Sequence, residues 1–363
     1  MKRIRYGRIA AIVAASALAL TACGNDPVSS GGSEQSSDLS GNLAGAGASS
    51  QESAMQAWIA GFGSSNPDVT VSYDPAGSGA GRTQFGEGAV DFAGSDAVLD
   101  DEERTAASER CGGDAIHLPL YISPIAVIYK LDGVDNLQFS PATVAAIFDR
   151  KITKWNDAKI KADNPDADLP DTRIVPVNRS DESGTTENFT EYLAATAGGA
   201  WPHEPSGDWP LKGGQSAQGT SGVVQTVQGG QGTIGYADAS QAGQLGTAKI
   251  KVGESFVEPS ADAAAKIVDE SERLSGGSEH DLAYELKRDT TTEGTYPIVL
   301  VSYTIVCQTY EDATQGELVK AFIGYVASED GQKAAAEAAG SAPISDTLRT
   351  EVAAALDAVS AGS

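Results

Sequence analysis

The stretch Ile174-Val-Pro-Val-Asn-Arg-Ser-Asp-Glu-Ser-Gly-Thr185 is followed by Phe189, Tyr192 and Leu193. Its β-branched start predicts a strand, its glycine and hydroxyl residues predict a turn, and the spaced apolar residues predict a helix with one buried face. A helix that begins this way exposes free backbone N–H groups at the positive end of its dipole. The stretch therefore predicts an α/β protein and a turn that is able to hold an anion.

The same character recurs at three other places in the chain. They are Gly45-Ala-Gly-Ala-Ser-Ser50, followed by Ala54, Met55 and Trp58; Gly77-Ser-Gly-Ala-Gly81, after a strand ending at Tyr73; and Gly219-Thr-Ser-Gly222, before Val223, Val224 and Val227. Taken singly, each such segment predicts no more than a helix cap. The first two and the Arg179–Thr185 turn together favour an anion-binding site, because several such helix starts can surround one ligand. The Gly219 segment is interpreted as a helix start near a cleft.

Strand-like and helix-like segments alternate through the rest of the body, which is typical of an α/β fold. The predicted strands are 69–73, 122–129, 174–177, 233–236 and 298–306. Ser140-Pro141 predicts a helix start, because a capping hydroxyl precedes proline at the first helical position. Leu318, Phe322, Tyr325 and Val326 have helical spacing and predict another buried face.

The charge balance limits what the protein binds. The chain has 25 basic and 50 acidic residues, which excludes nucleic-acid binding through the general field. An anion must then be held by local dipoles and hydrogen bonds. Three scattered histidines (His117, His203, His280) and the absence of a C-x-x-C motif predict no metal site and no cofactor.

Two charged residues stand beside the predicted turns. Arg179 carries a guanidinium, which can donate two parallel hydrogen bonds to an oxyanion. Asp96 ends the apolar run Val90-Asp-Phe-Ala-Gly-Ser-Asp96, where a strand is expected to end. A carboxylate repels an anion unless the ligand still carries a proton, as phosphate does near neutral pH and sulfate does not, so Asp96 would discriminate against sulfate. The alternative for Asp96 is a helix cap for Val98 onward.

The N-terminus predicts export and anchoring. A basic segment precedes the apolar run Ile9 to Leu20, which suits a signal peptide (1–22) and is too short for a permanent membrane span. Leu20-Thr-Ala-Cys23 resembles the bacterial lipobox, which predicts lipidation of Cys23; the alternative is an ordinary secreted protein. Residues 23–40 predict a flexible linker.

Outside the cytoplasm the remaining cysteines, Cys111 and Cys307, are expected to form a disulfide, although the sequence does not show that they meet.

Together these segments resemble the phosphate-binding proteins of the phosphate-specific ABC transporter. The matching pieces, in the family's order, are Gly45–Ser49, Gly77–Gly81, Val90–Asp96, Ile152–Trp155, Arg179–Thr185 and Gly232–Tyr236. The resemblance implies a two-lobed periplasmic-binding-protein fold of type II, with the ligand cleft between lobes joined by two crossover strands. It implies the phosphate-binding set Ser49, Ser50 (through its backbone N–H), Ser78, Asp96, Arg179, Ser183, Gly184 and Thr185. Glu182 replaces a glycine of the family pattern, which questions the local turn conformation.

The resemblance also implies the organisation and the partners. Lobe one would comprise 41–120 plus 297–363 and lobe two 121–296, which places Cys111 and Cys307 in the same lobe. The protein would be a monomer, lipid-anchored to the outer face of the cytoplasmic membrane, that delivers phosphate to the transmembrane permease and ATPase subunits of an ABC transporter.

Three alternatives compete with a phosphate receptor. An esterase or phosphomonoesterase with Ser78 or Ser183 as nucleophile needs a nearby base, and no histidine lies near these loops in sequence, so no enzymatic activity is predicted. A receptor for sulfate, molybdate or a phosphonate is the second alternative, and Asp96 is the feature that argues against it. The third is a surface protein that has lost ligand binding and serves as an adhesin or sensor.

Overall fold

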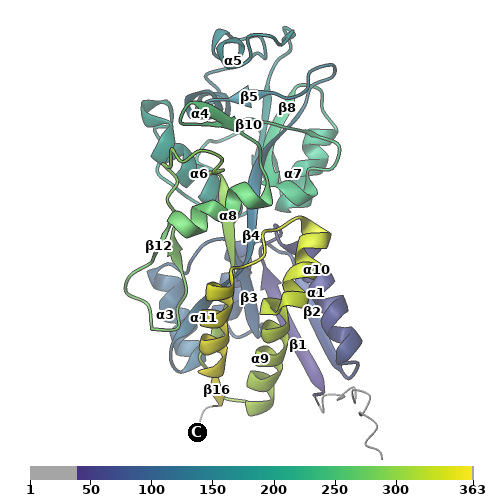
Figure 1. Cartoon of the computed structure of the whole chain (residues 1–363), viewed down its shortest axis with the longest axis vertical. Coiled ribbons are helices and arrows are strands. Elements are labelled where there is room, and N and C mark those ends of the chain that lie inside the picture. The colour runs from purple at the N-terminus through teal and green to yellow at the C-terminus, as the bar shows by residue number, and fades with distance from the viewer. Residues whose placement is uncertain (1–38, 362–363) are drawn as a thin grey trace, which may run out of the picture. The chain divides into compact units, whose positions relative to one another are not determined.

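The computed structural model describes residues 39–361, and it is an α/β structure built on one large sheet (Figure 1). The sheet order is β2-β1-β3-β14-β4-β8-β6-β7, with β9 paired to β4. The strands are β1 (Gly41–Gly47), β2 (Val69–Asp74), β3 (Phe92–Ser95), β4 (Ala115–Lys130), β6 (Val175–Arg179), β7 (Gln215–Ala217), β8 (Thr233–Asp238), β9 (Gly246–Thr247) and β14 (Val299–Cys307). The α/β class predicted from the sequence is confirmed.

Strand β4 connects two parts of this sheet. From Ala115 to Pro124 it pairs antiparallel with β14, and from Ile125 to Lys130 it pairs antiparallel with β8. Every residue of β4 except Lys130 is buried, which explains why this strand is a continuous apolar run rather than an alternating one. The β1–β2–β3 side and the β8–β6–β7 side are therefore joined through β4 and β14.

Helices divide between these two sides. We call β1, β2, β3 and the helices packed near them the β1 group, in the lower half of Figure 1. Its helices are α1 (Glu52–Ser65), α2 (Ser78–Gly86), α3 (Asp101–Cys111), α9 (Ala313–Ala327), α10 (Glu329–Ala339) and α11 (Asp346–Asp357). The β6 group comprises β6, β7, β8 and the upper helices α4 (Pro141–Phe148), α5 (Ala158–Asp163), α6 (Gly184–Thr196), α7 (Gly219–Gln228) and α8 (Ala261–Glu270).

Smaller elements complete the chain. The β6 group also holds a short sheet of order β11-β10-β5, and two two-stranded sheets pair β12 with β13 and β15 with β16. The bounds are β5 (Gln138–Phe139), β10 (Lys249–Val252), β11 (Ser255–Val257), β12 (Glu272–Arg273), β13 (Tyr284–Glu285), β15 (Thr309–Tyr310), β16 (Ser360–Ala361), η1 (Gly198–Ala200) and η2 (Ala239–Gln241).

Local signals in the sequence explain several helix ends. Helix α4 begins after Ser140 with Pro141 at its first position, as predicted. Asp100 and Glu103 form a reciprocal capping box at the start of α3, and Gly112 ends that helix with a positive φ of 61°. Leu318, Phe322 and Val326 of α9 are buried as predicted, whereas Tyr325 is only half-buried.

Cys111 and Cys307 form the predicted disulfide, which ties the end of α3 to the end of β14. The described residues, 39–361, belong to one contact unit, so the lobe boundaries 41–120 plus 297–363 and 121–296 stay a prediction. The signal peptide, Cys23 and most of the linker lie outside the described residues. Among residues 39–361, no helix combines the length and the hydrophobicity that a membrane span requires.

Candidate functional site

The predicted site lies where turns of the β1 group meet helix starts of the β6 group. Strands β1, β2 and β3 are parallel neighbours, with β1 in the middle, so their carboxyl ends share one edge of the sheet. The turns that follow them carry Ser49, Ser50, Ser78 and Asp96. From the other side come Arg179 at the end of β6 and the first residues of α6 and α7. Such an edge is the usual ligand position in open α/β sheets.

Asp96 is the centre of the hydrogen-bond network. Its Oδ1 accepts a hydrogen bond from Ser50 Oγ at 2.7 Å, and its Oδ2 accepts one from Thr185 Oγ1 at 2.8 Å. Its backbone N–H donates to Ser78 Oγ at 3.2 Å. The carboxylate is 3% exposed and therefore needs these partners. Asp96 thus joins residues from three turns, two of the β1 group and one of the β6 group.

Gly184 allows the start of α6 to approach Asp96 closely. A Cβ at Gly184 would lie 2.8 Å from Asp96 Cβ and 2.8 Å from Ser78 Oγ, closer than real Cβ contacts. Ser183 precedes it as the helix cap, and its Oγ accepts from the Thr186 N–H at 3.3 Å. The family-type glycine is therefore required here by close packing of two segments that are distant in sequence.

Arg179 is fixed by Asp181, for which no role was expected from the sequence. Its Nε donates to Asp181 Oδ1 at 2.9 Å and its Nη2 donates to Asp181 Oδ2 at 2.5 Å. Burial alone would raise the pKa of Asp181, but the hydrogen bond and charge of Arg179 outweigh it and lower that pKa below the usual 3.8. Asp181 Oδ1 also accepts from the Gly219 N–H at 3.1 Å, so the start of α7 supports the same pair.

Ser49 contacts the Gly219 segment, which was expected from the sequence to be only a helix start. The Thr220 N–H donates to Ser49 Oγ at 3.0 Å, and the two hydroxyls lie 3.1 Å apart. Gln241 Nε2 donates to the Ser49 carbonyl at 2.9 Å. The Gly219-Thr-Ser-Gly222 pattern was a usable signal for Thr220. No sequence signal marked Gln241, because its neighbours in the chain form no recognisable motif.

Glu182 does not disturb the turn. Its φ is not positive, so this position does not require a glycine. Its Oε1 accepts from Arg82 Nη2 at 3.0 Å, and Arg82 also contacts Glu103 at 2.8 Å. Burial raises the pKa of Glu182 despite the opposing charge of Arg82. Glu182 and Arg82 therefore add an ion pair between the two groups of elements.

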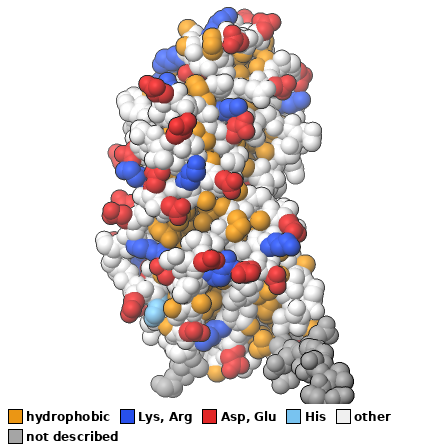
Figure 2. All heavy atoms as spheres, viewed as in Figure 1, with side chains coloured by type: hydrophobic (Ala, Val, Ile, Leu, Met, Phe, Trp, Pro, Cys, Tyr) orange, Lys and Arg blue, Asp and Glu red, His pale blue; other side chains and the backbone are white. Residues whose placement is uncertain are grey.

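Two of the histidines, His117 and His203, have partners away from the predicted site. His117 Nδ1 lies 2.7 Å from Asp281 Oδ1, and His203 Nε2 lies 2.8 Å from Asp149 Oδ1. Within residues 39–361, no cluster of three or more histidine, cysteine or acidic side chains could hold a metal ion. Figure 2 shows acidic side chains spread over the visible face with basic ones between them.

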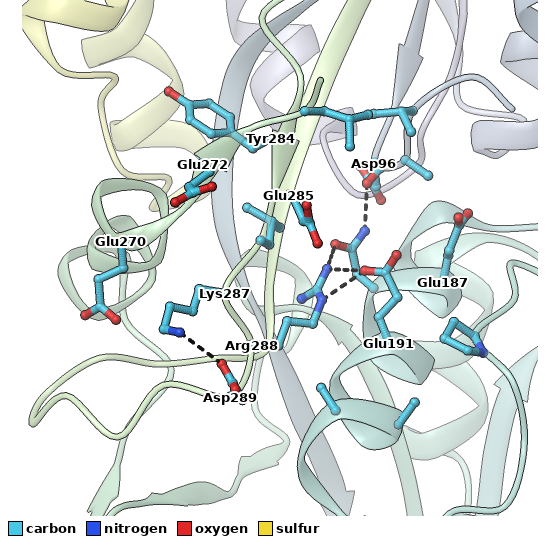
Figure 3. Close-up of a pocket in the computed structure, with 18 of the residues that line it drawn as sticks. Asp96, Glu187, Glu191, Glu270, Glu272, Tyr284, Glu285, Lys287, Arg288 and Asp289 are labelled. Carbon is cyan, nitrogen blue, oxygen red and sulfur yellow. Dashed lines mark hydrogen bonds and ion pairs between the residues drawn. The ribbon is translucent and has the colours of Figure 1, made fainter. Parts of the chain in front are cut away.

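A cavity of about 840 Å³ lies beside α6 (Figure 3). Acidic side chains outnumber basic ones in its lining and include Glu187, Glu191, Glu270 and Glu285. Of the eight predicted phosphate ligands, only Asp96 borders it. The other seven are buried where the two groups of elements meet. This cavity and the predicted site are therefore neighbours that share Asp96.

Comparisons with known proteins agree on one family and one fold. Residues 32–330 match the model of the PBP superfamily domain. Phosphate-binding protein PstS 3 of Mycobacterium tuberculosis is 35% identical over 99% of this chain and all of its own length. Phosphate-binding protein PstS 2 of the same species is 37% identical over the same shares.

Solved structures show the fold. A high affinity periplasmic phosphate-binding protein bound with phosphate matches with a TM-score of 0.69 and 22% identity, over 86% of this chain and 93% of its own. The phosphate binding protein from Stenotrophomonas maltophilia matches with a TM-score of 0.65 and 19% identity, over 87% and 94%. These likenesses confirm the predicted two-lobed periplasmic-binding-protein fold.

Proposed function

The chain belongs to the PstS phosphate-binding proteins of the PBP superfamily, and on this premise we propose that it binds inorganic phosphate and delivers it to an ABC importer. The observation that carries the proposal is the buried Asp96 carboxylate, which accepts hydrogen bonds from the hydroxyls of Ser50 and Thr185, while the backbone N–H of Asp96 donates to the Ser78 hydroxyl. A family of substrate-binding proteins acts by stoichiometric capture rather than by turnover.

We propose that the ligand shell consists of Ser49, the Ser50 N–H, Ser78, Asp96, Arg179, Ser183, Gly184 and Thr185. The starts of α1, α2 and α6 support this set, because each presents free N–H groups and a positive dipole end. A partly buried helix start contributes up to about 2 kcal/mol, and each hydrogen bond to a charged group roughly 1.5–3 kcal/mol. Local donors of this strength suffice for an anion in a chain of formal charge −25.

Arg179 and Asp96 have different roles in the proposal. Asp181 holds the guanidinium of Arg179 through two parallel bonds, so its orientation is set before a ligand arrives. Asp96 accepts the proton that phosphate still carries near neutral pH. Sulfate has no such proton, so the buried carboxylate repels it.

The location and the partners follow from the same proposal. Residues 1–22 act as a signal peptide, Cys23 carries lipid, and residues 23–40 tether the body to the outer face of the cytoplasmic membrane. The body works as a monomer with lobes 41–120 plus 297–363 and 121–296. It passes phosphate to the transmembrane permease and ATPase subunits of the transporter.

Isothermal titration calorimetry on the protein lacking residues 1–23 tests the function. The protein is first unfolded and refolded in phosphate-free buffer, because a tight ligand remains bound during purification. We expect one phosphate per chain, binding of arsenate, which also keeps a proton, and much weaker binding of sulfate. Sulfate binding as tight as phosphate, absence of phosphate binding, or steady hydrolysis of a chromogenic phosphate ester would each contradict the proposal.

A further inference from the structure

A chain of polar side chains leads from the wall of the cavity in Figure 3 to the main chain of Asp96. Asn188, in the second turn of α6, donates from Nδ2 to the Asp96 carbonyl at 2.7 Å. The Arg288 guanidinium donates to Asn188 Oδ1 and to Glu191. Neither Asn188 nor Arg288 belongs to the proposed ligand shell.

The surroundings of Asn188 define its orientation. Nδ2 also donates to the Gly184 carbonyl at 2.8 Å, so both of its hydrogens face carbonyl oxygens. Rotating the amide by half a turn would place Oδ1 against those two carbonyls and Nδ2 against the guanidinium of Arg288. Because Asn188 is 3% exposed, water cannot replace the lost partners.

Arg288 is itself held in place. It is 5% exposed, its Nη1 donates to the Val299 carbonyl at the start of β14, and its Nε donates to Glu191 Oε2 at 2.9 Å. Glu191 is 41% exposed, so its charge is partly screened by solvent and the carbonyl of β14 is the firmer anchor. The orientation of Asn188 thus depends on a strand shared by both groups of elements.

We propose that Asn188, held by Arg288, is a positioning residue that fixes the peptide of Asp96 for phosphate recognition. The inference rests on the proposed function. Ser78 and Thr185 are proposed ligands, so their hydroxyls are shared between Asp96 and phosphate. Asn188 donates a hydrogen bond to Asp96 and is not itself a proposed ligand. This bond joins α6 to the turn after β3, so it exists only while these two segments are in contact. It therefore stabilises the bound geometry of Asp96 and slows the release of phosphate.

The test is a double-mutant cycle on the protein lacking residues 1–23, with phosphate affinity and dissociation rate as readouts. Asn188→Ala should weaken phosphate about tenfold, mostly through faster dissociation, since it removes the buried hydrogen bond to the Asp96 carbonyl together with those to Gly184 and Arg288. In an Asp96→Ala background the same change should cost less than about threefold, because the carboxylate it positions is gone.

Asn164→Ala is the matched control. Asn164 is also buried, and its Nδ2 also donates to a distant carbonyl, that of Gln138, and to the carbonyl four residues before it. It caps the C-terminal end of α5, away from the site residues, so its loss should lower stability and leave phosphate affinity within about twofold of wild type. This separates positioning of Asp96 from a general effect of losing a buried amide.

The outcomes are distinct. If wild type binds no phosphate, the proposed function fails. If wild type binds and Asn188→Ala costs as much in both backgrounds, or no more than Asn164→Ala, the positioning role is overturned. Should Asn188→Ala fail to fold by circular dichroism, Asn188→Asp replaces it. That variant keeps the contact with Arg288 but sets a carboxylate oxygen against the carbonyls of Asp96 and Gly184, and undiminished phosphate affinity would overturn the inference.

Discussion

At the scale of single residues, we propose that Asp96 carries the specificity of the site. Its two carboxylate oxygens each already accept one hydroxyl, from Ser50 and from Thr185. An ionised carboxylate has only acceptors to offer, so a further partner at this position must bring its own hydrogen. A ligand without a proton would instead meet a buried negative charge.

Replacing Asp96 with asparagine should reduce discrimination between phosphate and sulfate. The amide loses a strong acceptor but no longer repels a fully ionised ligand. We expect phosphate to weaken by less than about tenfold while sulfate binding strengthens. Parallel calorimetric titrations with both anions at neutral pH measure the ratio.

Asp91→Asn is the control for the change in net charge. Asp91 also belongs to the β1 group, but its Oδ2 accepts from the Ala44 N–H rather than from a site residue. Its replacement should leave the phosphate-to-sulfate ratio unchanged. A ratio that does not fall in Asp96→Asn would disprove the proton-acceptor role of Asp96.

Asp238, at the end of β8, is a second buried carboxyl group with consequences for pH. It is fully buried and accepts from Tyr121 Oη at 3.1 Å and from the Ser240 N–H at 2.9 Å. Burial raises its pKa from 3.8 to about 6, against the hydrogen bonds from Ser240, and the charge of Asp96 adds to the rise. The folded protein therefore holds the proton of Asp238 more tightly than the unfolded chain does.

This pKa predicts a loss of stability as pH rises. Since the folded pKa is above the unfolded value, the contribution of Asp238 is fully present below 3.8 and is lost as pH passes through about 6. Between pH 3.8 and somewhat above 6, the free energy of unfolding of wild type should fall by an amount on the order of 1–3 kcal/mol because of Asp238. Asp238→Asn should lack this fall. Urea denaturation at several pH values measures it. Tyr121→Phe keeps the carboxyl group and should keep the decline; an equal slope in wild type and Asp238→Asn would refute the assignment.

At the scale of elements, the site depends on how closely two helix starts approach the turns of the β1 group. Helix α6 begins with Gly184 against Asp96 and Ser78, and the Thr220 N–H at the start of α7 donates to Ser49. Both approaches place backbone N–H groups near the proposed ligand. Side-chain volume at these first positions is therefore expected to control binding.

Gly184→Ala should weaken phosphate by about tenfold to a hundredfold. The new Cβ would lie 2.8 Å from Asp96 Cβ and 2.9 Å from the Ala97 nitrogen, so α6 must move away from Asp96. Calorimetry gives the affinity and thermal denaturation gives the stability. Gly63→Ala in α1 is the control, since its Cβ meets nothing within 4 Å and should leave binding unchanged. Normal phosphate affinity in Gly184→Ala would show that this close approach is not needed.

The disulfide acts at the same scale, because it joins the end of α3 to the end of β14 across 196 positions of sequence. Replacing Cys111 and Cys307 together with alanine should lower the free energy of unfolding by about 2–5 kcal/mol on a chain-entropy model. Denaturant titration with and without reductant measures the loss, and only wild type should respond to the reductant. Two reactive thiols besides Cys23 in unfolded, unreduced protein would contradict the pairing.

At the scale of the whole molecule, two tasks are proposed for a strongly acidic chain. It must bind an anion, and it must stay attached to a membrane. The formal net charge of −25 opposes both tasks. Buried hydrogen-bond donors solve the first, because their interactions are local and little screened. A covalent lipid would solve the second without any basic surface.

We predict that Cys23 is the lipidated first residue of the mature protein. Mass spectrometry of the membrane-extracted N-terminus should show a diacyl- or triacyl-glyceryl cysteine, and Cys23→Ala should release the protein from the membrane. A mature N-terminus at any other residue, without lipid, would disprove this.

The sequence by itself determined the α/β class, the helix start at Ser140-Pro141, the presence of a helix after the turn that begins at Arg179, the strand that ends before Asp96, and the cysteines of the disulfide. These features depend on near neighbours: caps, turns and hydrophobic spacing act over a few residues. The resemblance to a family supplied the set of proposed ligands.

Only the tertiary structure decided which of these segments support one another. Asp96 meets Thr185 across 89 positions, Ser49 meets Thr220 across 171, and Asn188 meets Arg288 across 100. Asp181, Gln241 and Arg288 gained roles that no local pattern marks. The physical reason is that β4 and β14 join the two sides of the sheet. Contacts between those sides follow from strand order and register, which local sequence does not encode.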